Sequence, residues 1–110
     1  MTTVVPFLHA LDARASAAWW GRLGFELEWE HRFAPKLPLF LALRRGDGRI
    51  FLSEHEGDAR PDTLLYLYVD DIHAVAAEFG VTPTVAEYGL LEVELRDPDG
   101  NRVRVGSPTA

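Results

Sequence analysis

The sequence lacks cysteine altogether, which excludes disulfides, thiolate metal sites and cysteine nucleophiles. No apolar run is long enough to cross a bilayer, and the first residues have neither the basic stretch nor the apolar core of a secretory signal. Basic residues are few, with 11 Lys and Arg against 17 Asp and Glu, which gives a formal net charge of −6. Without a membrane-spanning run or a secretory signal, we expect a cytoplasmic protein with no membrane partner. Because an acidic surface repels phosphate backbones, we also expect no nucleic-acid partner.

Metal-binding and nucleophile motifs are missing as well. The four histidines, His9, His31, His55 and His73, form no HxH or HExxH pair, and there is no GxSxG turn or phosphate-binding glycine loop. The stretch 54–56 (Glu-His-Glu) has ligand-type residues, but we interpret it as a solvated loop. What is present, 110 residues with ordinary hydrophobic content, is typical of a single globular domain.

Two helices can be predicted from the residues that begin and end them. Residues 13–23 follow Asp12, a good N-cap, and are closed by Gly24. Residues 72–79 follow two aspartates, carry apolar residues at positions i, i+3, i+4 and i+7, and are closed by Gly80. Strand-like runs lie around the first helix at 4–11, 25–32, 39–44 and 49–53, and around the second at 64–69, 82–87, 90–96 and 102–105.

The order strand, helix and three strands therefore occurs twice. This predicts an α+β fold of two tandem βαβββ modules within one domain of residues 1–110. Module one spans 1–54, a linker rich in Gly, Asp and Pro spans 55–63, and module two spans 64–110. In the last hairpin, residues 97–100 (Asp-Pro-Asp-Gly) suit a type I turn.

This pattern resembles the vicinal oxygen chelate superfamily, which includes glyoxalase I, extradiol dioxygenases, fosfomycin-resistance enzymes and bleomycin-resistance proteins. The most specific match is 96–101 (Arg-Asp-Pro-Asp-Gly-Asn) before the final strand, followed by the helix after Asp12 that leads into Leu-Gly-Phe at 23–25. The pattern Ile-Phe-Leu-Ser at 50–53 and an aromatic-rich fifth strand are most similar to bleomycin-resistance proteins. The resemblance implies curled mixed sheets around a cleft, the glyoxalase/bleomycin-resistance fold. The segment 80–88 is shorter than the corresponding loop of those proteins.

The resemblance also gives a test for metal binding. Metal-dependent members carry four ligands, two in each module, which are His, Glu or Gln. At the matching positions this chain has Val5, Leu52, Leu64 and Arg104, which are three apolar side chains and one permanent cation. The resemblance therefore implies a metal-free protein without a cofactor, and a binding protein rather than an enzyme.

Candidate ligand-binding residues follow from the same resemblance. Trp29 and Phe33 match aromatic positions of the groove, and Ser53 matches a groove serine. An aromatic plane beside a carboxylate, such as Trp29 beside Glu28, suits a planar cation. The full set consists of aromatic, polar and acidic side chains on or near strands: Trp29, Ser53, Tyr88, Phe33, Glu28, Tyr66 and His9.

Structural interpretations of these side chains stay open beside the functional ones. Trp29 and Tyr88 suit a core as well as a groove, and the glutamates around Trp29 also suit a solvated edge strand. Glu92 and Glu94 suit pairing across the last hairpin with Arg102 and Arg104. The aromatics expected in the core are Trp20, Phe25, Phe51 and Phe79.

We therefore expect a protein that binds and sequesters an antibiotic or other secondary metabolite, with a ligand that is cationic and planar. The resemblance implies a homodimer, and Pro6 matches the hinge at which superfamily members exchange the first strand between two chains. Two alternatives belong to other classes: a glyoxalase- or dioxygenase-like metalloenzyme, and a regulatory dimer without chemistry.

Overall fold

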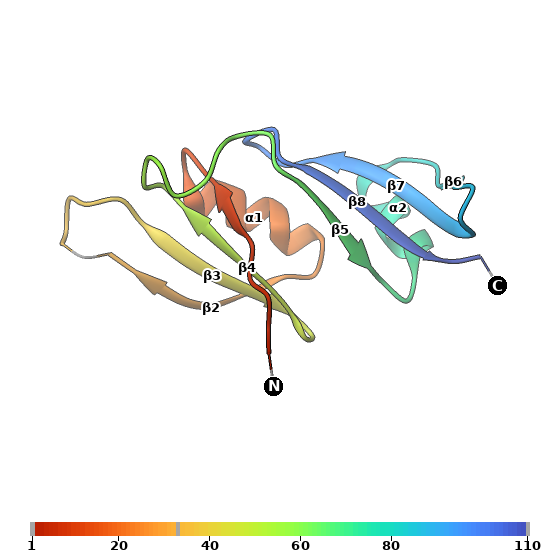
Figure 1. The fold of residues 1–110 in the computed structure, drawn as a ribbon, viewed down its shortest axis with the longest axis horizontal. Coiled ribbons are helices and arrows are strands. Elements are labelled where there is room, and N and C mark those ends of the chain that lie inside the picture. The colour runs from red at the N-terminus through yellow and green to blue at the C-terminus, as the bar shows by residue number, and fades with distance from the viewer. Residues whose placement is uncertain (1, 33, 110) are drawn as a thin grey trace. The chain divides into compact units, whose positions relative to one another are not determined.

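The computed structural model describes residues 2–32 and 34–109, so the candidate residue Phe33 lies outside the described residues. The chain forms two compact units. Unit 1 comprises the residues up to Thr63 together with Asp97–Asn101, and unit 2 comprises Leu64–Arg96 and the chain from Arg102 onward. Each unit contains one helix and one four-stranded mixed sheet, in the order strand, helix and three strands (Figure 1). The predicted α+β fold of two βαβββ modules is confirmed.

Unit 1 is built from β1 (Phe7–His9), α1 (Ala13–Arg22), β2 (Glu26–His31), β3 (Phe40–Arg45) and β4 (Gly48–Ser53). Its strands lie in the order β1-β4-β3-β2, with β1 parallel to β4 and the other pairs antiparallel. β1 is shorter than the predicted strand 4–11, and single backbone hydrogen bonds extend it at both ends, to the Pro6 carbonyl and from the Ala10 amide.

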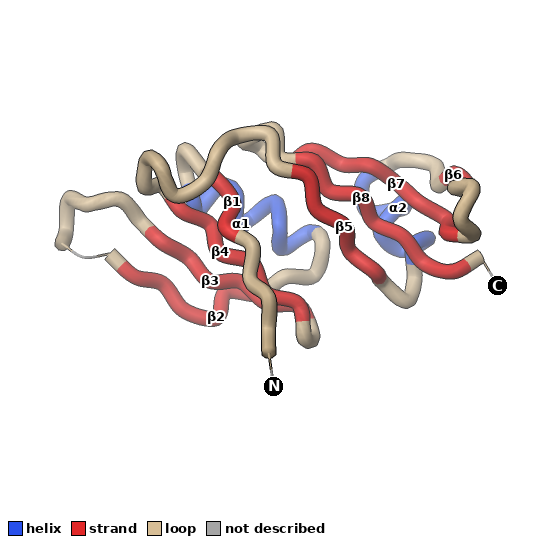
Figure 2. The backbone as a smooth tube through the Cα atoms, in the orientation of Figure 1, coloured by secondary structure: helices blue, strands red, loops and turns tan. Residues whose placement is uncertain are grey.

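The helix of unit 1 covers one face of this sheet (Figure 2). α1 begins where the sequence predicts, because the Asp12 carboxylate accepts a hydrogen bond from the Ala15 amide at 3.2 Å. Trp20 on α1 is fully buried, as expected. Alternate strand residues face the helix, so that Leu41 and Leu52 are buried while their neighbours in sequence point to the opposite face.

Unit 2 repeats the arrangement with β5 (Leu64–Tyr68), α2 (Ile72–Phe79), β6 (Thr84–Val85), β7 (Leu90–Arg96) and β8 (Arg102–Pro108). Its order is β5-β8-β7-β6, with β5 parallel to β8. β6 is only two residues long, not 82–87 as predicted, because Pro83 has no N–H to continue the pairing. β8 runs three residues beyond the predicted end at 105. Among the described residues, neither helix has the length and apolar character needed to span a membrane.

The turn between β7 and β8 belongs to unit 1, although both of its strands belong to unit 2. The buried Asp97 carboxylate accepts hydrogen bonds from the Trp20 indole Nε1 at 3.3 Å and from Asn101 Nδ2 at 2.9 Å. Asp99 accepts one from the Ser16 hydroxyl at 2.8 Å. The turn therefore satisfies polar groups of α1, and it is closed by a 3.0 Å hydrogen bond from the Gly100 amide to the Asp97 carbonyl, with Gly100 in the left-handed conformation.

Candidate functional site

A cluster of aromatic rings lies on the face of the unit 1 sheet that points away from α1. We define this aromatic face by Phe7, Trp29, Phe40 and Phe51, which come from β1, β2, β3 and β4 in turn. Strand register brings the rings together, because Phe7 lies opposite Phe51, Phe51 opposite Ala42, and Ala42 opposite Trp29. Ala42 contributes only a methyl group to this row, which leaves room for the large rings around it.

The rings form edge-to-face and stacked contacts. Trp29 and Phe40 are stacked, with centroids 5.7 Å apart and planes inclined by 13°, and Phe7 meets Phe51 edge-on at 5.2 Å. Trp29 is 45% exposed and Phe7 is 42% exposed, so the cluster presents apolar surface to solvent. The expectation that Phe51 lies in the core is wrong. Phe51 is only half-buried, because it alternates with the buried Ile50 and Leu52 and so faces away from the helix.

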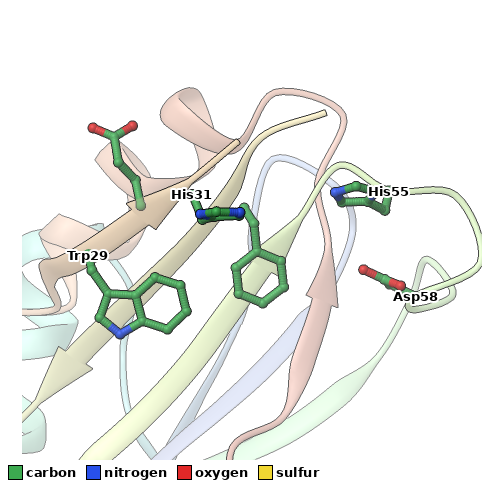
Figure 3. Close-up of a pocket in the computed structure, with 6 residues that line it drawn as sticks. Trp29, His31, His55 and Asp58 are labelled. Atoms are coloured by element: carbon green, nitrogen blue, oxygen red, sulfur yellow. The ribbon is translucent and has the colours of Figure 1, made fainter. Parts of the chain in front are cut away.

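A pocket of about 570 Å³ opens over one end of the aromatic face. Trp29 and Phe40 contribute its aromatic wall, and Glu30 also lines it. Figure 3 shows Trp29 and His31 on β2, and His55 and Asp58 on the loop that follows β4. The pocket therefore combines a flat apolar surface with imidazole and carboxylate groups, which is the usual composition of a small-molecule site.

Ser53 holds the loop that lines the pocket. Its side chain is fully buried, and its hydroxyl donates a 2.6 Å hydrogen bond to Oδ2 of Asp58 and accepts one from the His55 amide at 3.2 Å. Ser53 thus holds the loop that carries two pocket residues. His9 lies on the same face of the sheet, in register with Ser53, and is half-buried.

Glu54 fixes the other side of this loop. Its carboxylate accepts hydrogen bonds from the Ala13 amide at 2.8 Å and from the Leu39 amide at 3.0 Å. The interpretation of residues 54–56 as a solvated loop is therefore wrong for Glu54. Its side chain, directly after β4, is hydrogen-bonded to the first residue of α1 and to the residue before β3. The signal was not visible in the sequence, because the two partner amides are distant in the chain.

The acidic residues around Trp29 are largely paired. Glu28 lies 3.3 Å from Arg49, and Glu30 forms a 2.6 Å ion pair with Arg14 of α1. All six residues of β2 are exposed, and β2 is the edge strand of its sheet, as the solvated-edge interpretation predicts. Of the pocket's carboxylates, Asp58 accepts its hydrogen bond from a neutral group, so its charge is not offset by that contact.

Two further candidates, Tyr66 and Tyr88, lie on unit 2, on the sheet face opposite α2. The Tyr88 hydroxyl donates a hydrogen bond to the Glu92 carboxylate, and the Tyr66 and Tyr68 rings are 5.0 Å apart. The Tyr66 hydroxyl is buried beside Glu92 without reaching hydrogen-bond geometry with any described residue. Burial, and then the neighbouring Glu92 carboxylate, raise the pKa of Tyr66 above its usual value.

Of the two ion pairs predicted across the last hairpin, the one between Glu94 and Arg104 is confirmed and the one between Glu92 and Arg102 is wrong. Glu94 lies opposite Arg104 and forms a 2.9 Å ion pair with it, and this hydrogen bond lowers the pKa of Glu94. Glu92 does not face Arg102, because the register places Gly106 opposite Glu92 and Arg96 opposite Arg102.

The seven predicted site residues are thus distributed between the units. Four lie in unit 1, namely Trp29, Ser53, Glu28 and His9; two lie in unit 2, and Phe33 lies outside the described residues. Sequence reasoning missed several side chains of the aromatic face and pocket, which are Phe7, Phe40, Phe51, His31, His55 and Asp58. Within the described part of the chain, no group of three or more His, Asp or Glu is placed to hold a metal ion.

Comparisons with known proteins agree with this architecture. A family model described as glyoxalase superfamily protein matches residues 1–109, whereas no curated protein sequence matches. A bleomycin resistance determinant encoded on the transposon Tn5 has a similar structure, with TM-score 0.78, 21% identity and 100% of each chain covered. A bleomycin-binding protein complexed with bleomycin gives TM-score 0.74 and 22% identity over 97% of this chain and 98% of that one. A lactoylglutathione lyase from Agrobacterium tumefaciens gives 0.69 and 20%, over 97% and 94%.

Proposed function

The chain belongs to the glyoxalase superfamily, and we propose that it is a binding protein of bleomycin-resistance type that sequesters a small antibiotic or secondary metabolite. The observation that carries the proposal is the aromatic face of unit 1 with the pocket of about 570 Å³ over it. Two stacked rings, Trp29 and Phe40, give the ligand a flat surface. A planar ring system would bury apolar surface there and stack on the exposed indole.

The ligand we propose is planar and carries a positive charge. Trp29 can interact with a cation through its ring face. Glu28 and Glu30 contribute less than the sequence suggested, because both are paired with arginines. The charge preference therefore rests mainly on Asp58, whose carboxylate lines the pocket and is held by the Ser53 hydroxyl.

Binding by this surface needs no metal ion. Leu52, at one of the positions where metal-dependent relatives have a ligand, is fully buried in the core. Arg104, at another, is held by Glu94 and its positive charge repels a divalent cation. We therefore propose sequestration without metal chemistry, which is the function of a scavenger rather than of a lyase or an oxygenase.

We also propose that the protein works as a homodimer. The aromatic face exposes large apolar side chains, and a second copy that covers part of it would shield them and close the pocket. We propose that the first strand crosses to the partner at Pro6, which directly precedes β1. Its carbonyl accepts a 3.0 Å hydrogen bond from the Phe51 amide, which a strand from either chain could provide. Exchange of the first strand near Pro6 would thus retain the pairing of β1 with β4.

The test is a titration of the purified protein with planar cationic antibiotics, monitored by isothermal titration calorimetry, which does not depend on the indole that Trp29→Ala removes. We expect Trp29→Ala to weaken binding about two- to thirty-fold, since one exposed cation–π or stacking contact contributes roughly 0.5–2 kcal/mol. Trp19→Phe is the matched control, because Trp19 lies on α1, against the other face of the sheet. Binding should be the same with and without a chelator.

The stability of the Trp29→Ala variant shows whether Trp29 is a binding residue or a core residue. Trp29 is 45% exposed, so we expect Trp29→Ala to leave the denaturation midpoint nearly unchanged. Removal of a core tryptophan would instead cost roughly 3–5 kcal/mol of stability. A large stability loss, or binding that Trp29→Ala leaves intact, would contradict the proposed site, and stoichiometric metal that survives dialysis would contradict the proposed function.

A further inference from the structure

The sheet face of unit 2 opposite α2 carries a second cluster of aromatic rings, which the proposed function does not use. We define the tyrosine cluster as Tyr66 and Tyr68 on β5 together with Tyr88, which precedes β7. Tyr68 is 75% exposed and Tyr88 is 64% exposed, so both rings stand out into solvent. Tyr66 is half-buried, and its ring centroid lies 5.0 Å from that of Tyr68. Two of the three rings are thus exposed to solvent, and the third is half-buried.

Glycine at position 106 makes this arrangement possible. Tyr68 on β5 and Glu92 on β7 both lie opposite Gly106, so the three residues form one row across the sheet. A β-carbon at Gly106 would overlap the Tyr66 hydroxyl and lie 3.3 Å from Cγ of Glu92. Tyr66 therefore occupies the space that the missing side chain leaves, between Tyr68 and Glu92.

A carboxylate lies among the three rings. Glu92 accepts the Tyr88 hydroxyl and lies beside the buried Tyr66 hydroxyl. Both neighbours are neutral phenols, so these contacts leave its negative charge in place. Arg104, a cation on the neighbouring strand β8, is held by Glu94 at 2.9 Å and is thereby matched by a different carboxylate.

Aromatic faces around a carboxylate are the arrangement that recognises methylated ammonium groups. A quaternary ammonium has no N–H group, so hydrogen-bond acceptors contribute little to its binding. Aromatic ring faces and a nearby negative charge attract it instead. We propose that the tyrosine cluster, with Glu92 at its base, is a binding site for a methylated ammonium group. Tyr68 and Tyr88 form its walls and Tyr66 its floor. A pocket of about 330 Å³, lined by Glu92, Glu94 and Arg104 together with valine and threonine side chains, adjoins it and has room for the rest of such a ligand.

The probe is tetramethylammonium chloride, added to the intact chain at constant ionic strength with sodium chloride as the reference. The tyrosine and tryptophan rings are labelled with ¹³C and their NMR signals are followed. We expect saturable shifts at Tyr66, Tyr68 and Tyr88 with tetramethylammonium and none with sodium. Methylammonium should bind more weakly, because it is more strongly hydrated and finds few acceptors at the rings.

Matched variants separate the ring and charge contributions. Tyr68→Ala removes an exposed wall and should weaken binding at least about threefold, whereas Tyr68→Phe keeps the ring and should stay within about a factor of two. Glu92→Gln should weaken binding more than Glu78→Gln, which removes a carboxylate from α2 on the other side of the sheet. Circular dichroism of each variant checks that it is folded.

Several outcomes would overturn the proposal. They are the absence of saturable shifts, equal binding by Tyr68→Ala and Tyr68→Phe, equal effects of Glu92→Gln and Glu78→Gln, or tighter binding of methylammonium. Shifts confined to the Trp29 ring would place the cation on the aromatic face of unit 1 and would equally reject this site. The antibiotic titration does not depend on these results, so the two proposals can fail separately.

Discussion

The indole nitrogen of Trp20 donates a hydrogen bond of 3.3 Å to the carboxylate of Asp97, which follows it by 77 positions in the chain. Both side chains are buried, and Asp97 accepts three further hydrogen bonds, from the side-chain and backbone nitrogens of Asn101 and from the Asp99 amide. A buried carboxylate needs this many donors, because they replace the hydrogen bonds to water that it has lost.

Asp97→Ala should destabilise the fold by about 3 kcal/mol or more, since it leaves several buried donors without an acceptor and each costs roughly 1–3 kcal/mol. Asp97→Asn keeps one acceptor oxygen and should be milder. The measurement is the midpoint of urea denaturation, followed by circular dichroism. Ser16→Ala, which removes only the contact to Asp99, is the control for the turn. An unchanged midpoint for Asp97→Ala would mean that the turn is not an essential part of unit 1.

Gly106→Ala should destabilise unit 2 by roughly 1–3 kcal/mol, because the new methyl group overlaps Tyr66 and forces it to move. In a Tyr66→Ala background the same substitution should cost almost nothing. Gly21→Ala provides the reference: Gly21 lies within α1 with no atom near its missing β-carbon, so alanine there should raise stability by about 0.5–1 kcal/mol. If the penalty at Gly106 persists without Tyr66, the overlap is not its cause.

The protein should lose stability above about pH 10, where tyrosines of the unfolded chain ionise. The folded-state pKa of Tyr66 is raised by burial and by Glu92, so the folded chain keeps a proton that the unfolded chain releases. The corresponding stability is complete below the unfolded pKa and is lost as pH rises toward the folded one. Absorbance titration should show one tyrosine that ionises only on unfolding, and Tyr66→Phe should remove that step. Three tyrosines that ionise together at their usual pH would contradict this.

The protein should sediment as a species of about twice the 12.3 kDa chain mass at micromolar concentration. The reason is the apolar surface exposed by Trp29 and Phe7, which a second copy would cover. Phe7→Ser should weaken association, whereas Val85→Ser, at an exposed position of unit 2, should not. A monomer throughout the concentration range would reject the homodimer but leave the ligand titration to be judged by itself.

The helices and the module repeat could be predicted because their determinants are local. Asp71 caps α2 through the amides of His73 and Ala74, and Gly80 ends it with φ +66°. The aromatic face could not be predicted in the same way. Its rings come from four strands, and the register shift in β2 between Leu27 and Trp29 decides which of them meet.

The pocket depended on contacts that are distant in sequence. Trp29 was identified through a family resemblance and does line the pocket, whereas Asp58 and His55 fall in the predicted linker 55–63, to which the sequence assigned no role in binding. Their positions follow from Ser53, which matches a groove serine of the superfamily and whose hydroxyl holds Asp58. Alternation along β4 could have assigned Phe51 to the open face, since Ile50 and Leu52 on either side of it are buried.

The inclusion of Asp97–Asn101 in unit 1 has a consequence for the ancestry of such tandem chains. A half-length ancestor with a single βαβββ module would have kept the helix and sheet of unit 1 but lacked the acceptors for Trp20 and Ser16. The corresponding hairpin of a second molecule could have supplied them. In that view self-association came first, and two separate polypeptides formed this contact. A later gene duplication then placed both halves of the contact in one chain.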